Sequence, residues 1–255
     1  MAQVQERGPV SGSPLALTGE RTLPGIPDEN YWFRRHEAAY RAIAPWVVGA
    51  AVLEAGAGEG YGADLLRRSG SGPVIALDSS EQVVRHLAVH YPDVIAVRGD
   101  LQHLPVRDGV IDAVVHLQTI EHLRDQPGFI AECARVLRPA GTLVVSTPNR
   151  LTFSPGRDTP LNPFHVRELS PAELTDLLTP RFHVARLLGV RHGRRLRRGE
   201  RRVGSLVDAQ VAGPPETWSA GIREAVHTVR TNDFTVTADE IDTSLDLLVV
   251  AWRRP

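Results

Sequence analysis

Residues 52–62 read Val52-Leu53-Glu54-Ala55-Gly56-Ala57-Gly58-Glu59-Gly60-Tyr61-Gly62. The apolar start predicts a buried strand, and the glycines predict a tight turn that leads into a helix over residues 63–68. At the carboxyl edge of a parallel sheet, such a turn lets the backbone approach a nucleotide-like cofactor, because no Cβ stands in the way. A dinucleotide-binding G-x-G-x-x-G motif that began at Gly56 would need glycine at position 61, where Tyr61 stands. The turn therefore favours a different nucleotide-like cofactor.

The rest of the chain alternates apolar runs with helical segments. Besides the strand before the glycine turn, strands are expected at residues 74–77, 94–97, 110–117, 142–146, 182–188 and 245–251. This alternation predicts an α/β fold with a doubly wound, mostly parallel, seven-stranded sheet. Residues 1–20 are expected to be a disordered tail. Residues 21–255 are expected to form one domain, in which residues 190–240 are a cap inserted between the last two strands.

Composition excludes several classes of function. The 255 residues carry a net charge of −1, which gives no whole-molecule argument for nucleic acid or membrane binding. The chain contains no lysine, so a lysine nucleophile or general base is ruled out. Its single cysteine, Cys133, cannot form an internal disulfide. With no apolar run near the ~20 residues that span a bilayer, the sequence predicts a cytoplasmic protein without membrane insertion.

Four motifs at consistent spacing resemble those of the class I S-adenosylmethionine-dependent methyltransferases. They are Glu54 with Gly56, Gly58 and Gly60; Asp78; Gly99-Asp100-Leu101; and Leu117-Gln118 followed by Ile120-Glu121-His122-Leu123. The resemblance implies a Rossmann-like fold and S-adenosyl-L-methionine as the cofactor. Taken singly, each motif has a plainer reading, since Asp78 could cap a helix and Asp100 could be a turn residue.

The resemblance also implies roles for individual residues. The glycine turn, with Glu54, would face the methionine part of the cofactor, and Gln118 would lie near the same end. Asp78 would accept hydrogen bonds from the ribose hydroxyls, with Ser79 beside it. Asp100 and Leu101 would hold the adenine ring.

An aromatic triplet, Tyr31-Trp32-Phe33, precedes the first strand. It could form a lid over the cofactor, or it could pack a helix onto the sheet, because aromatic side chains bury large areas. We expect Tyr31 and Tyr40 near the cofactor and Trp32 in the core. Arg35 could pair with the carboxylate of the cofactor, although an exposed arginine on a helix is the commoner outcome.

The molecule that accepts the methyl group is expected to bind at the loop of residues 148–168. His165 is the leading candidate for a general base that takes the proton of an acceptor hydroxyl, because histidine titrates near neutral pH. Asp158 could assist it, and His122 is the second candidate. Either histidine could instead bond loop backbone. A metal-assisted reaction stays open because Asp and His residues are frequent near the loop, but no spacing is specific for a metal, so no metal site is assigned.

Longer phrases resemble a narrower actinobacterial group. They are residues 17–22, 29–36, 146–150 running on to 162–165, 208–210 and 242–247. These phrases are similar to the mycobacterial methyltransferases linked to methylglucose lipopolysaccharide biosynthesis and to methylation of the mycofactocin oligosaccharide. The resemblance implies a sugar hydroxyl of an oligosaccharide as the methyl acceptor.

Other functions stay open at this stage. The acceptor could be a small phenol, quinone or amine. The protein could also be a non-catalytic module that binds the cofactor and holds a partner through the arginine-rich run Arg191–Arg202. The sequence leaves the oligomeric state undecided.

Overall fold

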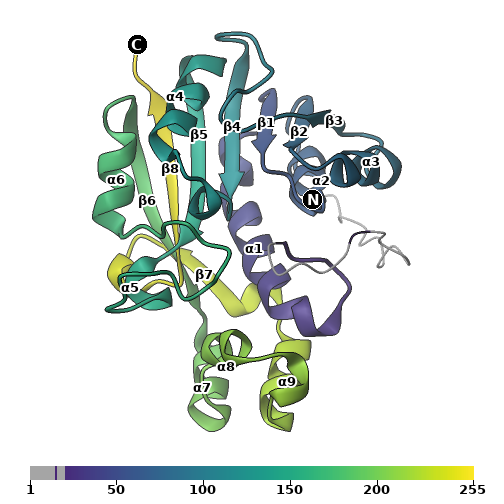
Figure 1. Cartoon of the computed structure of the whole chain (residues 1–255), viewed down its shortest axis with the longest axis vertical. Helices are drawn as coiled ribbons and strands as arrows, with labels where there is room; N and C mark the ends of the chain where they lie inside the picture. The colour runs from purple at the N-terminus through teal and green to yellow at the C-terminus, as the bar shows by residue number, and fades with distance from the viewer. Residues whose placement is uncertain (1–14, 16–20) are drawn as a thin grey trace.

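The computed structural model describes Leu15 and residues 21–255 (Figure 1). The tail expected at residues 1–20 therefore lies, except for Leu15, outside the described residues, and so does most of the phrase at residues 17–22. Within the described part of the chain, no helix combines the length and the apolar character needed to cross a membrane.

The described residues form one mixed sheet with the strand order β3-β2-β1-β4-β5-β8-β6-β7. The strands are β1 (Val52–Ala55), β2 (Val74–Asp78), β3 (Ile95–Arg98), β4 (Ile111–Leu117), β5 (Leu137–Pro148), β6 (Phe182–His192), β7 (Phe234–Thr237) and β8 (Asp246–Arg253). The first five strands in the chain run parallel, while β8 is antiparallel to both β5 and β6. The expected doubly wound, mostly parallel α/β sheet is thus confirmed.

The number of strands differs from the seven expected, because the described residues contribute eight. The additional strand, β7, lies inside the segment that the sequence assigns to a cap, and it pairs antiparallel with the end of β6. In the register, His192 lies opposite Phe234 and Val190 opposite Val236. Strand β6 therefore continues to His192 instead of ending near residue 188, since β7 gives its last residues a hydrogen-bonding partner.

Helices cover both faces of the sheet (Figure 1). They are α1 (Asn30–Ile43), α2 (Tyr61–Arg68), α3 (Glu81–His90), α4 (Gln126–Val136), α5 (Arg150–Phe153), α6 (Pro171–Leu178), α7 (Arg194–Val203), α8 (Leu206–Ala212) and α9 (Ala220–Thr228). Neighbouring residues of a strand enter different cores. Val144 packs in the core with α1 and α2, and Val145 in the core with α4 and α6. Burial on both faces explains why the inner strands β1, β4 and β8 are almost continuously buried instead of alternating between buried and exposed residues.

The chain between β6 and β8 forms helices α7, α8 and α9 as well as β7. These three helices gather at one end of the molecule, on the side where the N-terminus of α1 lies (Figure 1). Asn30, the first residue of α1, donates its side-chain amide to the carbonyls of Val226 at 3.0 Å and Val229 at 2.9 Å. These bonds join the inserted segment to the start of α1.

Candidate active site

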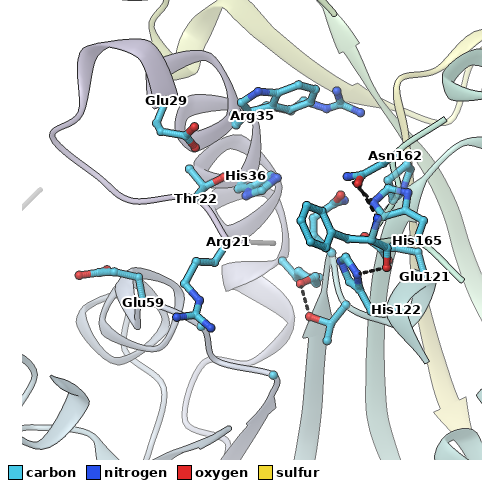
Figure 2. Close-up of a pocket in the computed structure, with 18 of the residues that line it drawn as sticks. Arg21, Thr22, Glu29, Arg35, His36, Glu59, Glu121, His122, Asn162 and His165 are labelled. Atoms are coloured by element: carbon cyan, nitrogen blue, oxygen red, sulfur yellow. Dashed lines mark hydrogen bonds between the residues drawn. The ribbon is translucent and has the colours of Figure 1, made fainter. Parts of the chain in front are cut away.

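A cavity of about 520 Å³ lies at the carboxyl ends of β1, β2, β4 and β5. This is the edge of the sheet where the strand order reverses, between β1 and β4, and where doubly wound proteins bind their ligands. Side chains of two groups face each other across it (Figure 2): Arg21, Thr22, Glu29, His36 and Glu59 on one side, and Glu121, His122, Asn162 and His165 on the other.

The glycine turn forms one wall of the cavity. Gly56, Gly58 and Gly60 have φ angles of +87°, +55° and +104°, a region that side chains disfavour. A Cβ on Gly56 would lie 2.7 Å from Cγ2 of Thr119, and one on Gly60 would collide with Leu87. A Cβ on Gly58 would meet no atom within 4 Å. Gly58 thus offers bare backbone to the cavity, whereas Gly60 serves packing and does not line it.

Asp78 stands at the end of β2, with its carboxylate fixed beside the cavity. The backbone N–H of Gly58 donates to Oδ2 at 3.1 Å, and that of Ser80 donates to Oδ1 at 2.9 Å. Asp78 and Ser79 both line the cavity. A carboxylate held in this way has lone pairs left for two neighbouring hydroxyls, so the residues present fit the ribose of a nucleoside.

Glu54 does not reach the cavity, contrary to the role expected for it. It is buried beneath α2, where the hydroxyl of Tyr40 donates to its Oε1 at 2.6 Å. Burial raises the pKa of Glu54 to about 8. Glu54 and Tyr40 therefore join β1 to α1, and Tyr40 is the member of the pair that lines the cavity.

The aromatic triplet is oriented opposite to the expectation. Tyr31 is fully buried and lies outside the cavity lining, with its hydroxyl 2.6 Å from Nε2 of His192 on β6. Trp32, expected in the core, lines the cavity. One residue along a helix turns the side chain by about 100°, so the direction in which α1 packs decides which ring reaches the ligand space.

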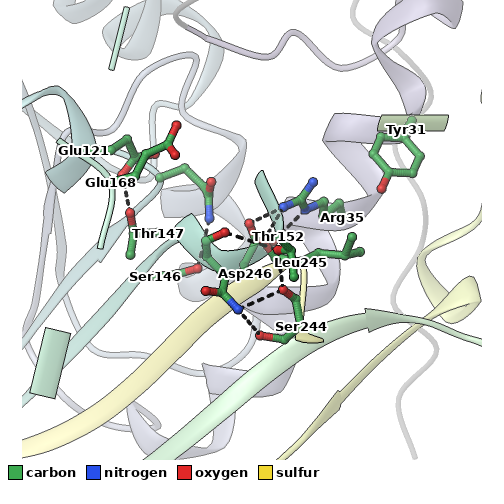
Figure 3. Close-up of polar contacts among 12 residues, drawn as sticks. Tyr31, Arg35, Glu121, Ser146, Thr147, Thr152, Glu168, Ser244, Leu245 and Asp246 are labelled. Carbon is green, nitrogen blue, oxygen red and sulfur yellow. Dashed lines mark hydrogen bonds and ion pairs between the residues drawn. The ribbon is translucent and has the colours of Figure 1, made fainter. Parts of the chain in front are cut away.

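Arg35 lines the cavity, but its charge is already compensated (Figure 3). Its Nε donates to Oδ2 of Asp246 at 2.6 Å, and its Nη2 donates to the carbonyl of Leu245 at 2.9 Å. Both partners of the ion pair are almost fully buried. Arg35 therefore fixes α1 to β8 at the cavity wall, and Arg21 is a second arginine in that wall.

Asp100 and Leu101 follow β3, yet neither lines the cavity. The Asp100 carboxylate is exposed and accepts a hydrogen bond from the backbone N–H of Gln102 at 2.9 Å. In the structure it acts as the turn residue that was the plainer reading of this motif. Strand β3 is the edge of the sheet, two strands from β1, which places the turn away from the cavity.

Gln118 and Glu121, at the far wall, are held by the strands beside them. Gln118 has a positive φ of +53° and donates its side-chain amide to Oγ of Ser146 at 3.0 Å. The hydroxyl of Thr147 donates to Oε2 of the buried Glu121 at 2.9 Å. Burial raises the pKa of Glu121 to about 7, an effect that nearby His165 and the Thr147 bond oppose. Burial therefore favours the protonated form of the Glu121 carboxyl group.

The two candidate histidines lie together at this wall. His122 and His165 pack edge to face, with ring centroids 5.0 Å apart. Nδ1 of His122 lies 2.9 Å from the carbonyl of Phe164, and Nδ1 of His165 lies 2.7 Å from Oε1 of Glu168. One ligand atom from each of Glu121, His122 and His165 lies within 4.8 Å of the others, so these three side chains could hold a metal ion.

Asp158, expected to assist His165, lies on the exposed surface of the loop and outside the cavity lining. The loop turns outward before it, where the backbone N–H of Arg157 bonds the carbonyl of Ser154 and Gly156 adopts a φ of +68°. The carboxylate that does contact His165 is Glu168, which the sequence reasoning missed. Its only sequence signal is the spacing of three residues after His165, which is too common to single it out.

Comparison with known proteins agrees with this geometry. Residues 53–145 match the family model described as "Methyltransferase domain". The chain is 52% identical over 252 residues to a probable S-adenosylmethionine-dependent methyltransferase of Mycolicibacterium smegmatis, covering 94% of this chain and 96% of that protein. A protein of the same description from Mycobacterium tuberculosis is 50% identical over 249 residues, covering 94% and 90%.

Among solved structures, the fold is similar to that of a Haloferax volcanii methyltransferase in complex with the Trm112 methyltransferase activator. The TM-score is 0.62 at 20% identity, over 87% of this chain and 91% of that one. The match along almost the whole length of the mycobacterial relatives, together with the cavity at the glycine turn, shows that this chain belongs to the S-adenosylmethionine-dependent methyltransferases.

Proposed function

We propose that the protein transfers the methyl group of S-adenosyl-L-methionine to a sugar hydroxyl of an oligosaccharide or polysaccharide precursor. The observation that carries the proposal is the composition of one continuous cavity. Gly58 and Asp78 line this cavity. Asn162 and His165 line it too, on the side opposite Arg21 and Glu59 (Figure 2). Carboxylate, amide and imidazole groups are the partners that multiple sugar hydroxyls require.

Binding of the cofactor is assigned to the residues around the glycine turn. The Asp78 carboxylate would accept the ribose hydroxyls, and the backbone of Gly58 would approach the cofactor closely. Arg21 and Gln118 line the same cavity, and Nη1 of Arg35 has no hydrogen-bond partner among the described residues, so the carboxylate of the methionine part is assigned to this group. The bound cofactor supplies an electrophilic methyl group on a sulfonium ion.

Removal of the acceptor proton is assigned to His165. A sugar hydroxyl is a poor acid, so it needs a base within hydrogen-bond reach as it becomes the nucleophile. His165 lines the cavity, and the chain has no lysine. Among side chains, imidazole is the usual general base in catalysis near neutral pH. His122 and Glu121 lie beside it and would bind neighbouring hydroxyls.

The alternative is a small phenol or quinone-derived acceptor, which the rings of Trp32 and Phe153 in the cavity wall would accommodate. A phenol is a much stronger acid than a sugar hydroxyl, so it would depend less on help from a base. The two acceptors therefore make different demands on His165.

The experiment offers both acceptor classes to the wild type and to His165→Ala with methyl-labelled cofactor. The proposal expects label on a glucose oligosaccharide and a loss of about 10²-fold or more in kcat for His165→Ala, the size of a general-base contribution. Label on phenols alone, at a rate that His165→Ala leaves unchanged, would establish the alternative.

A further inference from the structure

The hydrogen bonds around His165 fix which of its ring nitrogens carries the proton. The side-chain oxygen of Asn162 accepts the backbone N–H of Phe164 at 3.0 Å, so its NH₂ group is the one that faces Nε2 of His165 at 3.1 Å (Figure 2). An NH₂ group donates, and Nε2 must therefore hold a lone pair. The ring proton is left on Nδ1, which donates to Oε1 of Glu168 at 2.7 Å.

Glu168 is enclosed at this position. Its side chain is only 1% exposed, and its second oxygen, Oε2, has no hydrogen-bond partner among the residues that the structure describes. The His165 ring beside it is 6% exposed. A buried carboxylate stabilises a positive charge on a neighbouring histidine much more strongly than an exposed carboxylate would.

The backbone holds the two residues in register. The N–H groups of Val166 and Arg167 both donate to the carbonyl of Glu121, at 2.7 and 3.1 Å, between His165 and Glu168. One residue past Glu168, Leu169 pairs with Asn149 in an isolated bridge after β5. The loop segment is thus tied to the sheet on both sides of Glu168, so the His165–Glu168 contact belongs to the framework of the site.

We propose that Glu168 is the positioning residue of the methyl transfer, and that it presents Nε2 of His165 to the acceptor hydroxyl and stabilises the imidazolium that forms. The inference rests on the proposed function, since it needs an acceptor with a hydroxyl proton. In the free protein the Asn162 amide occupies the place at Nε2, and the acceptor hydroxyl takes that place when it binds.

The step balances without a further reactant. As the bond between the acceptor oxygen and the methyl carbon forms and the bond between sulfur and that carbon breaks, the hydroxyl proton passes to Nε2. The products are a methyl ether, S-adenosylhomocysteine and an imidazolium whose charge Glu168 compensates. The proton leaves to solvent after the products have gone.

The chain supplies a matched control in His192 and Glu200. Nδ1 of His192 lies 2.8 Å from Oε2 of Glu200, the same type of pair at nearly the same distance, and neither residue lines the cavity. Glu200→Gln removes the same charge from the same kind of contact. It reports what the loss of a histidine–carboxylate pair does to the fold alone.

The test compares wild type, Glu168→Gln, Glu168→Asp and Glu200→Gln by kcat and by KM for the cofactor. For Glu168→Gln we expect a fall in kcat of about 10- to 100-fold with KM for the cofactor unchanged. Glu168→Asp keeps the charge and therefore keeps more of the wild-type kcat than Glu168→Gln. Glu200→Gln leaves kcat unchanged.

A double variant and an NMR measurement test the inference further, and the NMR measurement needs no acceptor. Glu168→Gln added to His165→Ala should lower kcat by no more than about 2-fold, because a positioning residue has nothing left to position. In NMR spectra of the protein without acceptor, the Nδ1–H signal of His165 should move in Glu168→Gln and stay in place in Glu200→Gln, because Glu168 accepts that hydrogen.

The outcomes separate this inference from the proposed function. No label on any sugar, with label on phenols, contradicts the proposed function. An unchanged Nδ1–H signal of His165 in Glu168→Gln, or an equal fall of kcat in Glu200→Gln, overturns the role of Glu168, whether or not sugars are methylated.

Discussion

Arg35 of α1 and Asp246 of β8 form an ion pair in which each side chain is only 2% exposed. The pair lies at the wall of the cavity and joins two segments 211 residues apart in the chain (Figure 3). It ties the helix that covers the ligand space to the strand that completes the sheet between β5 and β6. The cavity therefore depends on a contact that no local pattern specifies.

Replacing Arg35 with Ala should lower the free energy of unfolding by about 3–5 kcal/mol, because Asp246 would stay buried without its partner. The measurement is urea-induced unfolding. The matched control is Arg85→Ala, which breaks the exposed pair with Glu81 and should cost no more than about 0.5 kcal/mol. Equal losses of unfolding free energy in the two variants would contradict the stabilising role of the buried Arg35–Asp246 pair.

Replacing Asp78 with Asn should weaken cofactor binding by about 10-fold or more, since one charge-assisted acceptor of the ribose hydroxyls is lost. Calorimetric titration with S-adenosyl-L-methionine measures it. Asp100→Asn is the informative comparison, because Asp100 is exposed and does not line the cavity. We expect its affinity to stay within about 2-fold of the wild type. Similar losses in both would restore the adenine-binding role that the sequence motif implies.

The glycines of the turn should separate into two classes. Gly58→Ala places a methyl group in open space, so it should raise the dissociation constant for the cofactor while costing about 1 kcal/mol of stability for its positive φ. Gly60→Ala drives the new Cβ into Leu87 and should lower the melting temperature much more. Thermal unfolding and calorimetric titration with the cofactor measure both effects in both variants. A larger loss of stability in Gly58→Ala and a larger loss of affinity in Gly60→Ala would refute the prediction.

The buried Glu54 should make the free energy of unfolding depend on pH. Its folded pKa of about 8 lies above the ordinary 4.5, so the folded state binds a proton that the unfolded state releases. Its contribution to stability is full below pH 4.5 and is lost as the pH rises towards 8. Glu54→Gln removes this proton exchange and keeps the acceptor for Tyr40. Its unfolding free energy should therefore fall less than that of the wild type between pH 5 and 8, and parallel curves would contradict the assignment.

Local patterns in the sequence account for seven of the eight described strands, and for the glycine turn and Asp78 beside the cavity. Gly56 and Gly58 follow a strand, and Asp78 ends the next one; both features are read within a few residues. Tyr31 and Trp32 were assigned the wrong way round, because their directions depend on where α1 packs. The four residues of β7 are too few to distinguish from a loop until β6 is known to lie beside them. Glu168 could not be recognised from the sequence, because only the fold of the loop brings its carboxylate into contact with His165.

The most direct measurement is transfer of a labelled methyl group from S-adenosyl-L-methionine to a glucose oligosaccharide, with the labelled atom located by mass spectrometry. The account predicts one methyl ether on a sugar hydroxyl with the wild type and a loss of at least about 10²-fold with His165→Ala. Failure to bind the cofactor, or label that reaches only non-sugar acceptors at a rate independent of His165, would contradict it.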